Sequence, residues 1–347
     1  MRRLAPIAPP LLAFMALLGV GAFAPSVAQV LDLALPFFGL ILLGYICGKL
    51  FDIPESGAAW MQTFIIYVAL PALFFNIIAA TPISELANWR FVLLTTSTTM
   101  IIFAWGFVTG YFGTRGDIAT ASIQATAGAY ANVGYMGPGL TLVALGPMST
   151  VPVALIVAFD SLFFFTAVPF LMGIAGAGDS SFAATARLVA RRVLTHPFNV
   201  ATVLGVLSAA AHLQFPAPVA KILTLLQGAS APCALFIMGV TVAQRPMRKI
   251  EAEMPLLLVL KLVAHPLLAW IMLSAFFDFG RVWTLTAVLM ASLPPALNVF
   301  VMATQYKTYV ERASGLVLAG TIGSVLTVTA LLYAIAVGNV PYNLFAR

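Results

Sequence analysis

The sequence predicts an all-helical membrane protein in which ten transmembrane helices form two inverted repeats of five. Three observations lead to this fold class. First, the 347 residues are 62% hydrophobic and only 8% charged, against roughly 25% charged residues in an ordinary soluble domain. Second, apolar runs of about 20 residues, the length that crosses a bilayer, follow one another along the chain. Third, similar proline-containing segments recur at one constant spacing in the two halves.

The predicted spans are separated mostly by short connections, so the sequence leaves no room for a separate soluble domain. Each span is an apolar run of about 20 residues. In chain order they are Val30 to Leu50, Ala58 to Ala80, Trp89 to Phe112, Ala119 to Leu145, Val151 to Gly176, Pro197 to Leu213, Val219 to Val242, Pro255 to Phe277, Trp283 to Thr304 and Ala313 to Val337.

The basic residues predict the orientation of these spans. If the first span starts outside, the inner loops hold ten basic residues: Lys49, Arg115, Arg187, Arg191, Arg192, Arg245, Arg248, Lys249, Lys307 and Arg312. The outer side holds four: Arg90, Lys221, Arg281 and Arg347. This positive-inside bias predicts a multi-pass protein of the inner (plasma) membrane with its mature N- and C-termini outside. Topology therefore accounts for the net charge of +6, and we expect no nucleic-acid partner.

Residues 1–28 differ from the ten-helix body. Arg2 and Arg3 precede a short apolar run from Leu11 to Ala24, and small residues follow at Ser26 and Ala28. This pattern favours a cleavable signal peptide; a retained extra helix and a wrongly assigned start codon are the alternatives.

The remainder divides into a first five-helix repeat at 29–176, a basic cytosolic connector at 177–196 and a second repeat at 197–347. Within the connector, Phe182 to Leu194 is predicted to be an interfacial helix.

The repeat is detected from prolines that recur 161 residues apart. Pro36 in the first span corresponds to Pro197 in the sixth, and Pro71 in the second span corresponds to Pro232 in the seventh. Because each repeat holds five helices, an odd number, the second copy enters the membrane from the opposite side. Inverted repeats are typical of secondary transporters, which bind substrate near the midplane between broken helices in matching positions.

The fourth and ninth spans are both predicted to be broken. The fourth contains "ANVGYMGPGL" at 131–140 and the ninth contains "ASLPPALNVF" at 291–300, so each combines proline with asparagine. The order of the two residues is reversed between the halves. A freed helix N-terminus favours an anion, and asparagine adds neutral donors and acceptors. The candidate substrate-binding residues are Asn132, Gly134, Pro138, Pro295 and Asn298; the alternative is a pair of proline kinks used only for packing.

At these residues the sequence resembles the auxin efflux carrier family, which includes bacterial malonate transporters and plant PIN auxin carriers. The resemblance also rests on "ALPALFFN" in the second span and "THPFNVATVLGVL" at the sixth, and it covers Val30 to Val337. It implies a fold like that of the bile-acid symporters, in which the fourth and ninth helices cross at their breaks beside the substrate. The chain departs from the family in its extra N-terminus, and it lacks the long central loop of the plant carriers.

Two charged residues lie well inside predicted spans, where charges are costly and are usually functional. Asp160 is in the fifth span and Lys261 is in the eighth, so both can flank the crossover and pair with each other. We expect them, with His265, to serve in coupling or charge balance; their placement resembles that in sodium/proton antiporters of a related fold. A purely structural ion pair, snorkelling of Lys261 and a packing role for His265 are the alternatives.

The predicted function is secondary active transport of a small organic carboxylate, malonate-like or auxin-like, by alternating access. The coupling ion is H+ or Na+, with no other cofactor and no metal site; the partners are the organic anion, the lipid bilayer and, by the family resemblance, a second copy in a homodimer. A sodium-coupled symporter or sodium/proton antiporter is the first alternative, and a substrate-sensing receptor without transport is the second. An enzyme is not expected, because no nucleotide-binding or catalytic motif is found.

Overall fold

A computed structural model describes residues 25–51, 53–83, 87–176, 187, 191, 194–195, 197–244, 251–338 and 340–345. Within these residues the regular elements are helices, apart from one isolated β-bridge. The prediction of an all-helical protein is confirmed for this part of the chain. The signal-peptide prediction at 1–28 falls largely outside the described residues, as does most of the connector at 177–196 with its predicted interfacial helix.

The first half of the chain forms long helices with one clear interruption. The second span is continuous but contains a π-helical turn, η1, between α3 and α4. The fourth span consists of two separate helices, α7 and α8. The elements are α2 (Pro25–Leu50), α3 (Glu55–Phe64), η1 (Ile65–Ala69), α4 (Leu70–Ala79), α6 (Trp89–Gly113), α7 (Ile118–Ala129), α8 (Gly137–Leu145), the 3-10 turn η2 (Pro147–Ser149) and α9 (Thr150–Ile174).

The second half has a similar order of elements. Its interrupted span consists of α15 and α16, and a second π-helical turn, η3, joins α13 to α14. The elements are α11 (Pro197–Ala210), α12 (Ala217–Gln244), α13 (Met254–Val259), η3 (Leu260–Ala264), α14 (His265–Phe276), α15 (Gly280–Ser292), α16 (Leu297–Gln305) and α17 (Val310–Ala336).

Six helices of the described chain are long and apolar enough to cross a membrane by themselves. They are Ser56–Ala79, Trp89–Gly113, Pro147–Ile174, Ala217–Ala243, Met254–Phe276 and Val310–Ala336. Two shorter apolar helices, Phe38–Leu50 and Val200–Ala210, fall in the predicted first and sixth spans. The predicted fourth and ninth spans are divided into halves of 9 to 13 residues, each too short to cross alone. The protein is therefore a multi-pass membrane protein, and the total of ten spans stays a prediction.

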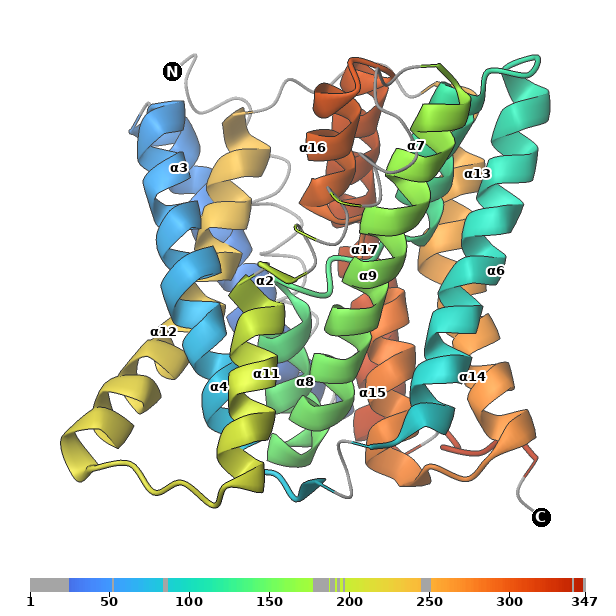
Figure 1. The fold of residues 1–347 in the computed structure, drawn as a ribbon. Coiled ribbons are helices and arrows are strands. Elements are labelled where there is room, and N and C mark those ends of the chain that lie inside the picture. The colour runs from blue at the N-terminus through green and yellow to red at the C-terminus, as the bar shows by residue number, and fades with distance from the viewer. Residues whose placement is uncertain are drawn as a thin grey trace.

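Helices α2, α3, α4, α11 and α12 pack together on one side of the molecule, and we call them the first helix group (Figure 1). Glycines permit the closest crossing in this group, between α2 and α12. A Cβ atom at Gly44 would lie 2.0 Å from the Phe236 carbonyl oxygen, and one at Gly239 would lie 1.9 Å from the Ile41 carbonyl oxygen. Such close backbone approach between small residues is typical of helix packing inside membranes.

The remaining helices, α6 to α9 and α13 to α17, form the second helix group, which contains both interrupted spans (Figure 1). Aromatic rings fill its interior: Tyr130 stacks on Phe164 with ring centroids 4.1 Å apart, and Phe91 contacts Trp283 edge-on. Large apolar side chains on the outer surface, such as Phe112 and Leu326, are exposed in a manner suited to lipid rather than water. The second helix group therefore places the two breaks inside the apolar body.

Candidate functional site at the two helix breaks

The two helix interruptions lie against each other and are joined through their backbones. Ala131 and Pro295 form an antiparallel β-bridge. The Asn132 N–H donates to the Pro294 carbonyl at 2.8 Å, and the Ala296 N–H donates to the Tyr130 carbonyl at 2.8 Å. These bonds satisfy backbone groups that the helices leave unpaired where they stop. The predicted breaks are thus confirmed, and the structure brings them together.

Local sequence explains why the helices stop at these points and why the two breaks fit together. Pro294 and Pro295 have no backbone N–H, so α15 cannot continue through them. Pro295 packs on α17, where a Cβ atom at Gly320 would lie only 2.4 Å from its Cδ atom. On the other break, a Cβ atom at Gly137 would lie 2.5 Å from the Met290 sulfur. Glycine at 320 is therefore required for the close approach of the rigid Pro295 ring, whereas a side chain at 137 would displace the flexible end of Met290.

The five predicted substrate residues all lie at the breaks, but they have different environments. Asn132 is in the non-helical stretch after α7, and Gly134 is in the turn before α8. Pro138 is in the first turn of α8. A backbone N–H there has no partner within the helix, so proline at this position removes no helical hydrogen bond. Pro295 forms the bridge, and the Asn298 amide, in the first turn of α16, donates to the Tyr130 hydroxyl at 3.2 Å.

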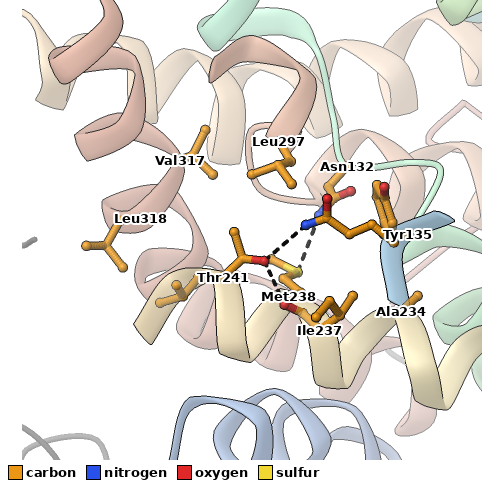
Figure 2. Close-up of a pocket in the computed structure, with 11 residues that line it drawn as sticks. Asn132, Tyr135, Ala234, Ile237, Met238, Thr241, Leu297, Val317 and Leu318 are labelled. Carbon is orange, nitrogen blue, oxygen red and sulfur yellow. Dashed lines mark hydrogen bonds between the residues drawn. The ribbon is translucent and has the colours of Figure 1, made fainter. Parts of the chain in front are cut away.

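Of these five residues, Asn132 is the one that lines the pocket between the two helix groups (Figure 2). Its side chain is 3% exposed, and its amide donates to the Met238 sulfur at 3.4 Å. A thioether is a weak acceptor. The Asn132 amide is therefore available to a stronger acceptor, such as a carboxylate.

The pocket is narrow and largely apolar, and residues of both helix groups line it. Gln62 of α3 and Thr241 of α12 face it from the first group, and the Gln62 amide donates to the Thr241 hydroxyl at 3.4 Å. Asn132, Tyr135 and the first residue of α16, Leu297, face it from the second group. Its volume of about 20 Å³ holds roughly one water molecule. A carboxylate can therefore enter only if the helix groups move apart.

The electrostatic character of this pocket comes from dipoles rather than charges. Among the described residues that line it, none is charged. Helices α8 and α16 both begin at the breaks, and the N-terminal end of a helix carries a partial positive charge. Leu297 at the start of α16 lines the pocket directly, and Tyr135 belongs to the turn that leads into α8. This arrangement favours an anion, with neutral side chains as hydrogen-bond partners.

A second polar group, which we call the buried cluster, consists of Thr99, Asp160, Lys261 and His265. Each of these side chains is at most 3% exposed. The Thr99 hydroxyl donates to Asp160 Oδ1 at 3.1 Å, and its oxygen lies 3.5 Å from His265 Nε2. His265 Nδ1 lies 3.0 Å from Lys261 Nζ, which also donates to the Ala291 carbonyl.

The three predicted coupling residues are therefore close together, although they are outside the pocket. Within the described part of the chain, Asp160 and Lys261 make no direct ion pair at 4.0 Å or less; Thr99 and His265 lie between them. Ala291 is in the last turn of α15, where carbonyls lack helical partners and the helix dipole favours a cation. Lys261 thus connects the buried cluster to the second break.

Some residues of the site were not expected from sequence. Gln62 and Thr241 gave no signal because single polar residues in apolar spans often bond only within their own helix. Tyr130, directly before the first break, and Thr99, within a run of threonines, gave a weak signal by position alone. Asn76 of α4 and Gln227 of α12, two further polar residues inside apolar spans, bond to each other.

An apolar helical body with two interrupted helices that meet at a buried, uncharged pocket defines a membrane transport protein. The chain belongs to the family described as "Membrane transport protein", whose profile matches residues 29–332. This result confirms the resemblance to the auxin efflux carriers and shows a transporter rather than an enzyme. The chain is 46% identical over 318 residues to a Rhizobium meliloti protein called "Putative malonate transporter", covering 92% of this chain and 99% of that protein. It is 26% identical over 294 residues to an "Uncharacterized transporter" of Methanothermobacter thermautotrophicus, covering 83% and 92% respectively.

Proposed function

We propose that this protein is a secondary carrier of a small organic carboxylate, which binds where the two helix breaks meet. The observation that carries the proposal is the convergence of Asn132 and the start of α16 on one pocket whose described lining residues are all uncharged. The name of the Rhizobium relative makes a malonate-like dicarboxylate the first candidate substrate, and an auxin-like acid is the second. The proposal requires no organic cofactor and no metal ion.

We further propose that the chain forms two inverted five-helix repeats, at 29–176 and 197–347. The packing of the first helix group supports this architecture, because α2 packs on α12 while α11 packs on α4. In the predicted repeat α2 corresponds to α11 and α4 corresponds to α12, so one contact is the counterpart of the other. The loop after α6 and the loop before α17 lie at the same end of the molecule (Figure 1), and they carry Arg115 and Lys307 of the predicted inner set.

Transport would proceed by movement of the first helix group against the second. The pocket lies between them, with Gln62 and Thr241 on one side and Asn132 on the other. Because the pocket holds about one water molecule, the structure corresponds to a closed state at this point. Opening toward either face in turn would give alternating access in the inner membrane, with the ends of the ten-helix body outside. A homodimer, expected from the family, is tested by crosslinking in membranes.

A cation-driven function is the alternative that Asp160 supports, because it is a carboxylate buried within a membrane helix. A sodium-coupled symporter or sodium/proton antiporter would use this residue directly. Among the described residues, no group of three or more histidine, cysteine, aspartate and glutamate side chains could hold a metal ion. The pocket at the two breaks, lined by Asn132 and the start of α16, favours the carboxylate carrier over an antiporter. Binding without flux would instead indicate a substrate-sensing receptor.

The test is a current measurement on purified protein in proteoliposomes adsorbed to a solid-supported membrane. Jumps of malonate, other carboxylates and indole-3-acetate are compared with steps of sodium or pH alone. We expect carboxylate currents that fall by about tenfold or more in Asn132→Ala, because a hydrogen bond to a charged group is worth about 1.5 to 3 kcal/mol. The control is Thr63→Ala, an exposed residue next to Gln62. Currents from cation steps alone, indifferent to carboxylates, would overturn the proposal.

A further inference from the structure

The buried cluster contains an acid, a base and a cation inside the membrane-spanning body, yet it does not line the pocket. Its four side chains come from α6, α9, η3 and α14 and are all nearly inaccessible to solvent. Ionisable residues are rarely retained at such positions without a function. Elsewhere the described interior of the second helix group packs through apolar and aromatic side chains and through uncharged polar ones such as Thr126 and Ser324.

The distances in the buried cluster form one continuous chain of hydrogen-bonding groups. An ammonium can only donate, so Lys261 Nζ donates to His265 Nδ1 over 3.0 Å. A neutral His265 then carries its proton on Nε2, which faces the Thr99 oxygen at 3.5 Å. The Thr99 hydroxyl in turn donates to Asp160 Oδ1 at 3.1 Å. Every donor therefore points the same way, from the Lys261 ammonium to the Asp160 carboxylate.

The groups that face Asp160 are a limited set. The titratable groups near Asp160 are Lys261 of η3, His265 of α14 and the Tyr130 hydroxyl at the first break, and α6 adds the uncharged Thr99. Arg281 of α15 donates a hydrogen bond to the Ile335 carbonyl rather than to Asp160. With Asp160 ionised and Lys261 charged, the buried cluster is neutral. Addition of one proton to Asp160 leaves it with a net charge of +1.

The ligand chemistry of the buried cluster favours a proton over a sodium ion. A hard cation such as Na+ requires several oxygen ligands, by analogy with other hard cations in proteins. Around Asp160 the cluster offers one carboxylate and one hydroxyl, and the neighbouring positions are a histidine ring and an ammonium group. A proton needs only the carboxylate oxygen and a hydrogen-bonded neighbour.

Two connections join the buried cluster to the breaks. Lys261 donates to the Ala291 carbonyl in the last turn of α15, immediately before the second break. On α9, Phe164 lies one helical turn beyond Asp160 and stacks on Tyr130, whose carbonyl and hydroxyl bond to the second break. A change of charge in the buried cluster therefore acts on groups that hold both breaks in place.

We propose that the buried cluster is the coupling site, and that one proton bound at Asp160 travels with each carboxylate. This inference rests on the proposed carboxylate transport. In the binding step an O–H bond forms between Asp160 and a proton from the aqueous phase, and the cluster gains one positive charge. That charge favours an anion at the adjacent breaks. On the other side of the membrane the same O–H bond breaks, and both proton and carboxylate leave.

The experiment separates coupling from transport in the same proteoliposomes. Exchange of external labelled malonate for internal malonate requires substrate movement but no coupling. Accumulation of labelled malonate in empty vesicles that are alkaline inside requires a proton to move with it. We expect the unaltered protein to do both, with an imposed sodium gradient giving no accumulation. Asp160→Asn is expected to keep exchange within about twofold and to reduce accumulation by about tenfold or more.

The matched control is Asp278→Asn, which removes an exposed carboxylate in the loop before α15. It is expected to keep both activities. Equal accumulation by Asp160→Asn and the control, or accumulation driven by sodium, would overturn the coupling proposal while exchange still supported the carrier. Absence of malonate exchange in the unaltered protein would contradict the carrier itself.

A second measurement does not depend on the folding of a variant. A pH-sensitive dye outside vesicles of the unaltered protein reports alkalinisation when malonate is added, if protons enter with it. We expect this signal to disappear when a protonophore is present. A malonate flux without any change in external pH would contradict coupling at the buried cluster.

Discussion

The two helix breaks use the same kinds of residue in different ways. At the first break, Asn132 lies outside the helices, between α7 and α8, and its side chain faces the pocket. At the second break, Asn298 lies inside the first turn of α16, and its amide donates to Tyr130 across the crossover. The order of proline and asparagine is reversed between the two segments, which accounts for this difference. Asn132 therefore faces the pocket in which we propose that substrate binds, whereas Asn298 joins the two breaks.

The helices that lead into the two breaks also end differently. Helix α7 ends with an ordinary backbone bond, from the Tyr130 N–H to the Thr126 carbonyl at 2.8 Å. Helix α15 ends with its Ala291 carbonyl bonded to the charged Lys261. The buried cluster therefore contacts the second break directly, through Lys261, and reaches the first break indirectly, through the stacking of Phe164 on Tyr130. If the proposals hold, we expect substrate to act mainly on the first break and the proton mainly on the second.

The largest effect is expected from Lys261→Met. The change leaves the Ala291 carbonyl and His265 without their donor and leaves Asp160 without a counter-charge nearby. A lost hydrogen bond from a charged group costs about 1.5 to 3 kcal/mol, so we expect the apparent Tm in detergent to fall by about 5 °C or more. Lys221→Met, on the exposed part of α12, is the control. If Lys261→Met and Lys221→Met have the same apparent Tm, the second break does not depend on the Lys261 cation.

The second prediction compares the two asparagines directly. Asn132→Ala is expected to reduce malonate exchange by about tenfold or more with little change in Tm, because its present acceptor is only the Met238 sulfur. Asn298→Ala is expected to lower exchange less and Tm more, since it removes a bond that joins the two breaks. Exchange rates and melting curves on the same preparations test this. If the two variants lose the same amount of exchange and of Tm, the inferred difference in role between the two asparagines is wrong.

A smaller effect is expected from Tyr130→Phe, which removes the hydroxyl that accepts from Asn298. We expect the free energy of unfolding to fall by about 0.5 to 1.5 kcal/mol, the net contribution of one uncharged hydrogen bond. Because both side chains belong to the same contact, the double variant with Asn298→Ala is expected to lose less than the sum of the two single losses. Thermal unfolding of the three variants measures this, and simple additivity would mean that the contact is not formed.

The smallest effects are expected at the N-terminal ends of α7 and α13. Asp117 caps α7, and the hydrogen bond from the Thr120 hydroxyl lowers the pKa of its carboxyl. At the start of α13, burial tends to raise the pKa of Glu253, but hydrogen bonds from Tyr309 and Arg312 outweigh it and bring the pKa below its ordinary value of 4.5. Both residues are substantially exposed to solvent, so each contributes at most about 1 kcal/mol.

The sign of this pH dependence follows from the depressed pKa values. Both carboxyls contribute their stabilisation above their unfolded-state pKa values, and the contribution is lost as the pH falls through the lower folded-state values. We expect the Tm difference between the unaltered protein and Asp117→Asn or Glu253→Gln to be small at pH 7 and to vanish in acid. A difference that grows as the pH falls would contradict the assigned contacts.

Much of the candidate site could be predicted because it depends on residues that disrupt helices. Proline, glycine and asparagine within apolar runs indicated both breaks, and the constant spacing of Pro36 and Pro197 indicated a repeat. Asp160 and Lys261 were recognisable because charges inside apolar spans are costly. The direct pairing expected for these two residues was not found, since sequence spacing cannot show that Thr99 and His265 lie between them.

By itself the sequence determined that the chain spans the membrane, where two of its helices are interrupted, and which family it belongs to. These properties follow from local chemistry, namely hydrophobicity along the chain and the effect of proline on backbone hydrogen bonding. Only the tertiary structure decided that Asn132 faces the pocket while Asn298 bonds to Tyr130, and that Lys261 holds the end of α15. Such contacts join residues 30 to 168 positions apart, and packing between helices decides which of them meet.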